Sequence, residues 1–238
     1  MGTTELIALS MGMAWASGVN LYATLGMLGI MGATGNMDLP PDLAILTNPM
    51  VIVAACAMYV IEFFADKVPG VDTVWDTLHT FIRIPAGAML AAGALGEIGP
   101  AAEMTALILG GGLAGVSHGV KAGSRVLINA SPEPFTNWAA STGEDAAVFG
   151  GLWVAISHPL VFLALLGVFV LLAIWLLPKL WRGIKFLFAK LRQLFGGPKA
   201  EPPARMPSSS TGAVFQAGPR SDGEQTPETD NPPDKPAG

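Results

Sequence analysis

The chain has 238 residues, of which 51% are hydrophobic and only 13% are charged, and its mean hydropathy is +0.51. These values and the long apolar runs are typical of an integral membrane protein and argue against a soluble domain. The net charge of −5 is unevenly distributed, because residues 1–178 carry 12 acids and 4 bases whereas residues 179–238 carry 6 acids and 9 bases. The acidic body argues against a nucleic-acid partner and favours a cation, a proton or a cationic solute.

Five apolar segments could each cross a bilayer or most of it, since roughly 20 helical residues are needed to span one: residues 5–33, 49–66, 83–97, 104–128 and 158–178. A shorter apolar segment covers about 143–156. The first segment is too long for one upright helix and contains five glycines, so it is either strongly tilted or broken within the membrane, and we favour a break. Whether 5–33 and 104–128 span or re-enter is left open by the sequence.

The C-terminal part changes character after the last apolar segment. Residues 179–195 place aromatic and aliphatic side chains at helical spacing with five bases largely opposite, which predicts a basic helix lying on an anionic leaflet. The positive-inside rule then puts this end of the last span in the cytoplasm. Residues 196–238 are polar and proline-rich and are predicted to be a disordered tail. The N-terminal stretch lacks the basic region of a signal peptide, so we expect it to belong to the mature protein.

The expected fold class is therefore an all-α integral membrane protein with about five spans, some of them broken or re-entrant, in a membrane domain of residues 1–178. Three short matches in the same order suggest two related halves, about 5–97 and 104–178. They pair Ala16-Ser17-Gly18-Val19 with Val116 to Val120, Thr34-Gly35 with Thr142-Gly143, and Thr47 to Val51 with Ser157 to Val161. Three crossings between the copies make an inverted repeat, as in many secondary transporters, whereas two crossings would make the repeats parallel.

A cluster of charged residues follows the second apolar segment. Four of its side chains recur at i, i+4, i+7 and i+11 and so share one face of a helix: Asp72, Asp76, His79 and Arg83. Two interpretations stay open. The four residues could form a solvated face of an interfacial helix, or the helix could fold back so that they line a polar cavity. Carboxylates there would suit hard cations, and a titrating histidine would suit proton coupling.

Two further acids lie in the last turn of the second apolar segment. Glu62 and Asp66 are four residues apart at the negative end of the helix dipole, where two acids are disfavoured unless a cation joins them. Lys67 partly fills that role. The pair is either a marker of the water boundary or a place where a cation binds or a proton is shared.

A second constellation lies in the fourth apolar segment, and its members are Ser117, His118, Lys121 and Arg125. Charges at membrane depth are costly, so Lys121 and Arg125 are expected to face a cavity or counter-ions, unless they already lie at the interface. The candidate counter-ions are Glu144 and Asp145. In the first half, Asn20 and Tyr22 occupy the positions that match Lys121 and Gly123, so a pseudo-symmetric site would have one neutral and one cationic half.

Enzyme signatures are lacking in this sequence. The three histidines, His79, His118 and His158, show no HExxH or Cys/His ligand spacing, and the glycine-rich run at 110–112 makes no nucleotide-binding loop. We expect no enzyme activity and no cofactor. A metal site is left undetermined, with Glu62 and Asp66 as the candidate ligands.

The stretches E-F-F-A-D-K-V-P-G-V-D, W-D-T-L-H-T-F-I-R-I-P-A-G-A and A-S-G-V-N-L-Y-A-T-L resemble an uncharacterised bacterial membrane family, the domain of unknown function 4126. The resemblance covers about residues 5–178 and implies no established activity. Glu62, Asp66 and Lys67 are also similar to the E-x-G-D-K signature of membrane cation exchangers with inverted repeats, although the spacing here is one residue longer and lacks the glycine. That second likeness implies a cation substrate.

Two functional hypotheses follow. The first is a small secondary transporter or permease for a cation or small solute, with proton coupling as an option. The second is a non-transporting membrane scaffold or lipid-binding protein that uses its basic helix and tail. The expected location is the bacterial inner membrane with a cytoplasmic C-terminus. The expected partners are anionic lipid at residues 179–195 and a small cation or solute, without nucleic acid, and a homo-oligomer is left open. A transporter requires the charged residues to converge, whereas a scaffold leaves them at two water interfaces.

Overall fold

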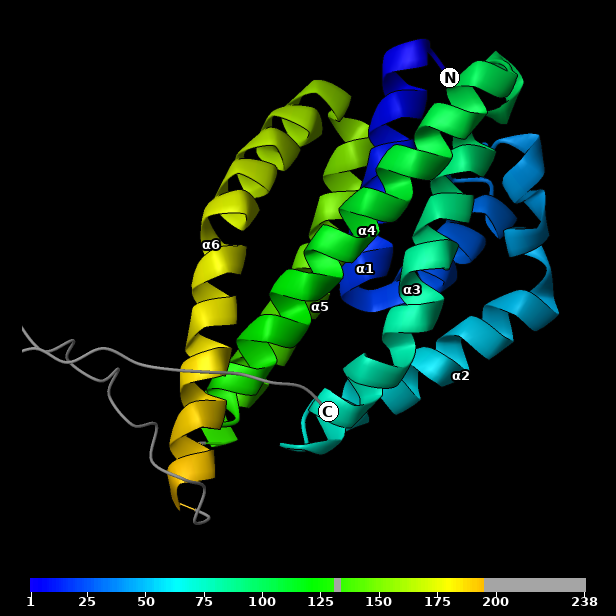
Figure 1. Cartoon of the computed structure of the whole chain (residues 1–238). Coiled ribbons are helices and arrows are strands. Elements are labelled where there is room, and N and C mark those ends of the chain that lie inside the picture. Colours follow the sequence, from blue (N-terminus) through cyan, green and yellow to red (C-terminus); the bar gives the residue numbers. More distant parts are fainter. Residues whose placement is uncertain (131–133, 195–238) are drawn as a thin grey trace, which may run out of the picture. The chain divides into compact units, whose positions relative to one another are not determined.

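The computed structural model describes residues 1–130 and 134–194, and all regular elements within these ranges are helical. Figure 1 shows their arrangement. In chain order they are α1 (Thr3–Ala33), η1 (Pro41–Thr47), α2 (Pro49–Ala65), α3 (Val71–Leu95), η2 (Gly96–Ile98), α4 (Pro100–Ile128), α5 (Pro134–Ser157) and α6 (Pro159–Leu194). Prolines begin α2, α4, α5 and α6, as is common at the first position of a helix. The predicted tail, residues 196–238, lies outside the described residues.

Several helices have the length and apolar composition of membrane spans. Three qualify individually: α1, the α3–η2 stretch (Val71–Ile98), and α6 over Pro159–Lys190. The η1–α2 pair, bent by 69°, adds a fourth if it forms one span. Among the described residues, α4 and α5 do not meet the same test. The chain is therefore an all-helical protein with three or four candidate spans, and the count of five stays a prediction.

Helix α1 lies at the centre of the bundle, and most of its residues are buried. It is interrupted at Asn20, whose φ of −147° and ψ of 98° are not helical. This is the break that the sequence predicts for the first apolar segment. The interruption is stabilised locally, because the Asn20 side chain accepts a hydrogen bond from the Ala23 amide (3.0 Å). Helix α1 thus brings a kinked, polar piece of backbone into the interior.

Small residues let α1, α3 and α4 approach closely. A Cβ atom at Gly18 of α1 would lie 1.9 Å from Ser117 Oγ of α4, and one at Gly110 of α4 would lie 2.3 Å from the Cβ of Ala91 in α3. Gly87 of α3 fits between α4 and α1 in the same way, 2.6 Å from both Ala114 Cβ and Ser17 Oγ. Such contacts are characteristic of helices packed in membranes. Residues 83–97 accordingly have a face buried against other helices, which includes Gly87 and Ala91.

Two boundaries differ from the expected ones. The amphipathic stretch from Val71 and the apolar segment 83–97 form one helix, α3, with Pro85 inside it, and not two elements. Likewise, the basic helix expected at 179–195 is the C-terminal part of the 36-residue helix α6, with Pro178 inside it. In both cases a change in composition along the sequence was interpreted as a break, whereas the backbone continues through it.

The three matched sequence pairs occupy partly different settings. Gly18 of α1 packs against Ser117 of α4, so the first pair meets in space. In the third pair, Thr47 to Val51 and Ser157 to Val161, each stretch contains the first residue of a helix, Pro49 of α2 and Pro159 of α6. In contrast, Thr34 caps the end of α1 whereas Thr142 lies within α5. The internal repeat therefore stays a prediction.

Candidate functional site

Charged side chains from four parts of the bundle meet in its interior and are connected by ion pairs. We call this group the ion network, and its members are Glu62, Asp66, Asp72, Asp76, Arg83, Lys121, Arg125 and Glu144. They come from α2 and its C-cap, from α3, from α4 and from α5. All are buried except Glu144, whose side chain is 19% exposed. Such burial is tolerable only because each charge has partners.

Arg83 of α3 joins α2 to α3 at one end of the network. Its side chain is fully buried and pairs with Glu62 and, at 2.9 Å, with Asp76, which lies two turns earlier on the same face of α3. It also donates to Nδ1 of His118 in α4 (3.3 Å). The predicted i, i+4, i+7, i+11 face is therefore directed into the bundle. The interpretation of that face as solvated is wrong, since Asp72, Asp76 and Arg83 are each no more than 1% exposed.

Lys121 of α4 lies at the centre of the network. Its ammonium is 2.7 Å from Asp66 Oδ2 and 3.4 Å from Glu62 Oε1, and it donates to the backbone carbonyl of Val19 (3.0 Å). Asp76 and Glu144 lie 3.7 Å away. The Val19 carbonyl directly precedes the break in α1. Lys121 thus pairs with both acids at the end of α2 and satisfies a carbonyl next to the interruption.

Arg125, one turn after Lys121, connects α4 to α5 and to the end of α2. It contacts both carboxylate oxygens of Glu144, at 2.6 and 3.3 Å, and donates to the backbone carbonyl of Asp66 at 2.8 Å. Asn137 of α5 accepts a further hydrogen bond from it. The expected pairing of Arg125 with Glu144 is therefore present, and Arg125 is enclosed by protein.

Asp145 and Asp72 each accept hydrogen bonds from an asparagine side chain of another helix. Asp145 accepts a hydrogen bond from the Asn20 side chain (3.0 Å), which links α5 to the break in α1. Asp72, at the start of α3, accepts two hydrogen bonds from the Asn129 side chain of α4 (2.7 and 2.9 Å). Lys67 stands at the edge, over the Phe63 ring and 3.4 Å from Ser141 Oγ. The four basic residues of 1–178 are thus all in or beside the network.

Two histidines border the network, and each is hydrogen-bonded at both ring nitrogens. Nδ1 of His79 lies 2.8 Å from the Trp75 carbonyl, which can only accept, so Nδ1 carries a proton, and Nε2 shares a hydrogen bond with the Tyr22 hydroxyl (3.1 Å). His118 accepts from Arg83 at Nδ1, so its Nε2 donates to Thr80 Oγ1 (2.7 Å). The Trp75 ring stacks on His79 at 4.3 Å. Both rings are oriented by fixed partners.

The network contains more negative than positive groups. Five carboxylates face three cationic side chains, so two carboxylates are in excess when every group is ionised. Several carboxylate oxygens are also buried without a hydrogen-bond partner among the described residues: Oε2 of Glu62, Oδ1 of Asp66, Oδ2 of Asp76 and Oδ2 of Asp145. Unpartnered buried acceptors of this kind call for a proton or a cation. Within residues 1–130 and 134–194, no group of three or more His, Cys, Asp or Glu side chains is placed to hold a metal ion.

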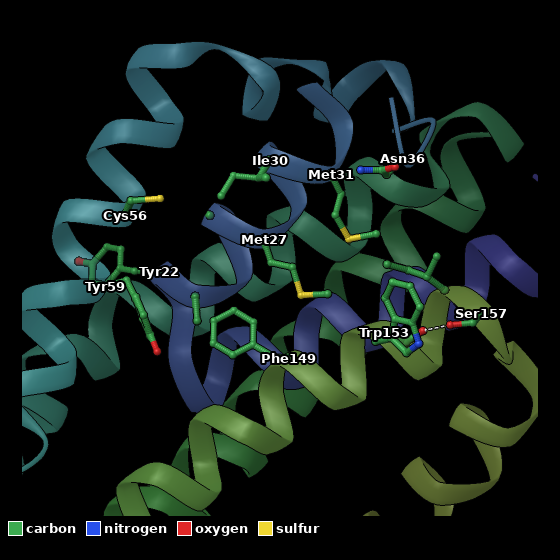
Figure 2. A pocket seen from close by; sticks show the side chains of 13 residues that line it. Tyr22, Met27, Ile30, Met31, Asn36, Cys56, Tyr59, Phe149, Trp153 and Ser157 are labelled. Atoms are coloured by element: carbon green, nitrogen blue, oxygen red, sulfur yellow. Dashed lines mark hydrogen bonds between the residues drawn. The ribbon is translucent and has the colours of Figure 1, made fainter. Parts of the chain in front are cut away.

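An apolar cavity lies beside the network, between the second half of α1, α2 and α5. Its volume is about 770 Å³, and Figure 2 shows aromatic and sulfur-containing side chains around it, among them Met27, Tyr59, Phe149 and Trp153. Tyr22 belongs to both regions, because it lines the cavity and its hydroxyl contacts His79. The Tyr22 hydroxyl therefore links the cavity to His79 at the border of the network.

Sequence reasoning found the charged members of the site and missed four neutral side chains that hydrogen-bond to the site residues. Asn137, Ser141, Thr80 and Asn129 complete the hydrogen bonding of Arg125, Lys67, His118 and Asp72. The available signal was weak. Asn137 and Ser141 are four apart and Ser141 is four before Asp145, so they share one face of α5 with a predicted residue.

The fold and this site define an all-helical membrane protein with a buried, interhelical ion network. The chain matches the family described as "Domain of unknown function (DUF4126)" over residues 7–179, and it belongs to that family. The resemblance found in the sequence is therefore confirmed, and the matched region contains the whole ion network. No curated protein and no solved structure matches the chain.

Proposed function

We propose that the protein is a small secondary transporter or permease for a cation or small solute, with the ion network as its substrate site and with coupling to protons. The single observation that carries the proposal is the convergence of charges from α2, α3, α4 and α5 on one buried centre in which carboxylates outnumber cationic groups. A network that served only to hold helices together would be more stable with balanced charge, and apolar side chains would often serve equally well.

The break in α1 supports the same proposal. Transporters commonly bind their substrates where a membrane helix is interrupted, because the freed backbone groups can contact an ion. Here the Val19 carbonyl and the Asn20 side chain face Lys121 and Asp145. An interrupted helix and an acid-rich network thus meet at one place.

The proposal also includes the number of membrane crossings, the internal repeat and the cellular location. We infer five crossings, two related halves in inverted orientation, and a location in the bacterial inner membrane with the C-terminal tail in the cytoplasm. The cytoplasmic side is supported by the bases at the end of α6, where Lys179 lies over the Trp175 ring at 3.0 Å. Helix α6 has 36 residues, about 54 Å at 1.5 Å per residue, which exceeds a hydrocarbon core of about 30 Å. Its basic end therefore extends toward anionic lipid headgroups.

The second candidate is a non-transporting scaffold or lipid-binding protein. The specific observation in its favour is this same basic end of α6, which fits an anionic membrane surface. In this alternative the ion network is only structural.

The experiment that tests the proposal is a flux measurement in proteoliposomes. Purified protein is reconstituted, and uptake of sodium, potassium and protons is followed with and without a pH gradient, with protein-free liposomes as the control. We expect cation uptake that depends on the pH gradient. Flux equal to that of protein-free liposomes for every cation, together with selective binding to anionic vesicles, would favour the scaffold.

A further inference from the structure

The Lys121 ammonium occupies a shell of oxygen atoms that suits a small cation. Five oxygens from five residues lie 2.7 to 3.7 Å from Nζ: the Val19 carbonyl and one carboxylate oxygen each from Glu62, Asp66, Asp76 and Glu144. Carbonyl and carboxylate oxygens are the ligands that hard cations prefer. The Lys121 side chain is only 2% exposed, so its ammonium is surrounded by these oxygens in place of water.

The shell retains negative charge even with the ammonium inside it. Glu62, Asp66 and Asp76 each contact Lys121 through one oxygen, and each has a second buried oxygen without a hydrogen-bond partner among the described residues. Arg83 and Arg125 also pair with acids of the shell. The four acids of the shell nevertheless outnumber these two guanidinium groups and the ammonium by one. The shell therefore favours a cation by its charge as well as by its geometry.

The distances indicate the class of that ligand. Calcium takes oxygens at 2.3–2.6 Å and magnesium at 2.0–2.1 Å, and the oxygens around Nζ lie farther away. In the part of the chain that the structure describes, no group of acids and histidines is placed to hold a metal ion without rearrangement. The two nearest oxygens, at 2.7 and 3.0 Å, suit a monovalent cation the size of ammonium or of a larger alkali ion. The other three, at 3.4 to 3.7 Å, contact such an ion after a small rearrangement.

We propose that a monovalent cation binds at the position of Lys121 Nζ and exchanges there with the ammonium group, so that Lys121 is a tethered competitor of the substrate. The long, flexible lysine stem allows the ammonium to leave while the oxygens stay in place. The partly exposed Glu144 marks the side of the shell nearest to solvent. This inference rests on the proposed function, since it names the substrate class of the same site.

The first test removes the competitor. The thermal unfolding temperature of the detergent-solubilised full chain is measured for the wild type and for Lys121→Met in sodium, potassium, ammonium and choline chloride at equal ionic strength. We expect the variant to unfold at a higher temperature in at least one of the three small cations than in choline, with a saturating concentration dependence, and the wild type to respond less.

Lys67→Met is the matched control, because it removes the same charge from the edge of the network, where the ammonium contacts the Phe63 ring and Ser141. We expect no difference between its small-cation and choline values. Equal unfolding temperatures of Lys121→Met in all four salts would overturn the inference. An equally large cation-dependent change of the unfolding temperature in Lys67→Met would overturn it as well, because the change would then not be specific to the Lys121 position.

The second test uses the wild type and does not depend on the folding of a variant. An amine-reactive probe is applied in sodium, potassium and choline chloride, because free ammonia would consume the probe. Modification of Lys121 is quantified by mass spectrometry, with the exposed Lys179 as the internal standard. Displacement predicts that modification of Lys121 increases with the concentration of the bound cation while that of Lys179 stays constant. A constant rate at Lys121 in every salt would contradict the exchange.

These readouts separate the inference from the proposed function. A cation-dependent response at Lys121 without flux in proteoliposomes supports the binding site and rejects the transporter. Flux without any response at Lys121 supports a transporter and rejects this site for its cation.

Discussion

Replacing Arg125 with Leu tests whether the ion network holds the bundle together. The substitution removes the bidentate partner of Glu144 and the donor to the Asp66 carbonyl, and it leaves the Asn137 side chain without its cationic partner. Breaking a buried ion pair by removing one partner typically costs about 3 to 5 kcal/mol. Because Glu144 retains some exposure, we expect a loss near the lower end, about 3 kcal/mol of unfolding free energy.

The assay is chemical unfolding of the purified protein in mild detergent, followed by far-ultraviolet circular dichroism. Arg182→Leu is the matched control, since Arg182 is exposed and its hydrogen bond is to the Pro178 carbonyl of its own helix. It should change stability by no more than about 0.5 kcal/mol. The double variant Arg125→Leu with Glu144→Leu should lose less than the sum of the two single variants. An Arg125→Leu protein that unfolds at the wild-type denaturant concentration would refute the account of Arg125 as a buried, paired charge.

Two further predictions concern packing and topology. Gly18→Ala should destabilise the protein by about 1 to 3 kcal/mol in the same unfolding assay, because its Cβ would overlap Ser117 and the Ala114 carbonyl, whereas Gly150→Ala in α5, which has open space, should be neutral or stabilising. If the two substitutions change the unfolding free energy equally, α1 and α4 are not closely packed at Gly18. In a Cys56→Ala background, Thr3→Cys should react with a membrane-impermeant thiol reagent from outside and Ser210→Cys from inside, because an odd number of spans places the ends on opposite sides. Labelling of both from one side would establish an even count and reject both five spans and the inverted repeat.

The sequence predicted which residues would be brought together and one of their pairs, Arg125 with Glu144, but not the other pairs. The spacing of Asp72, Asp76 and Arg83 fixes one helix face, because helical periodicity is a local property. The partner of Arg83 across the bundle is Glu62, 21 positions away, and this choice depends on how α2 crosses α3. The break in α1 was predicted from the length and glycines of its segment, but its position at Asn20 depends on partners in α4 and α5, at Lys121 and Asp145.

The same reasoning explains what the sequence left out. Continuity of α3 through Pro85 and of α6 through Pro178 runs against the usual effect of proline, and packing decides it. The apolar cavity bordered by Tyr22 and Trp153 depends on the spacing between three helices, which local patterns do not specify.

The most direct test of the central claim is cation flux in proteoliposomes for Glu62→Gln and Asp66→Asn, with Glu103→Gln as the control. Each amide keeps the shape of the side chain and removes its charge and titration, and Glu103 is an exposed acid in the first turn of α4, outside the ion network. If the network is the transport site, both network variants lose the pH-dependent flux while retaining wild-type elution from a gel-filtration column, and Glu103→Gln transports as the wild type does. Unchanged pH-dependent flux in both Glu62→Gln and Asp66→Asn would contradict the account.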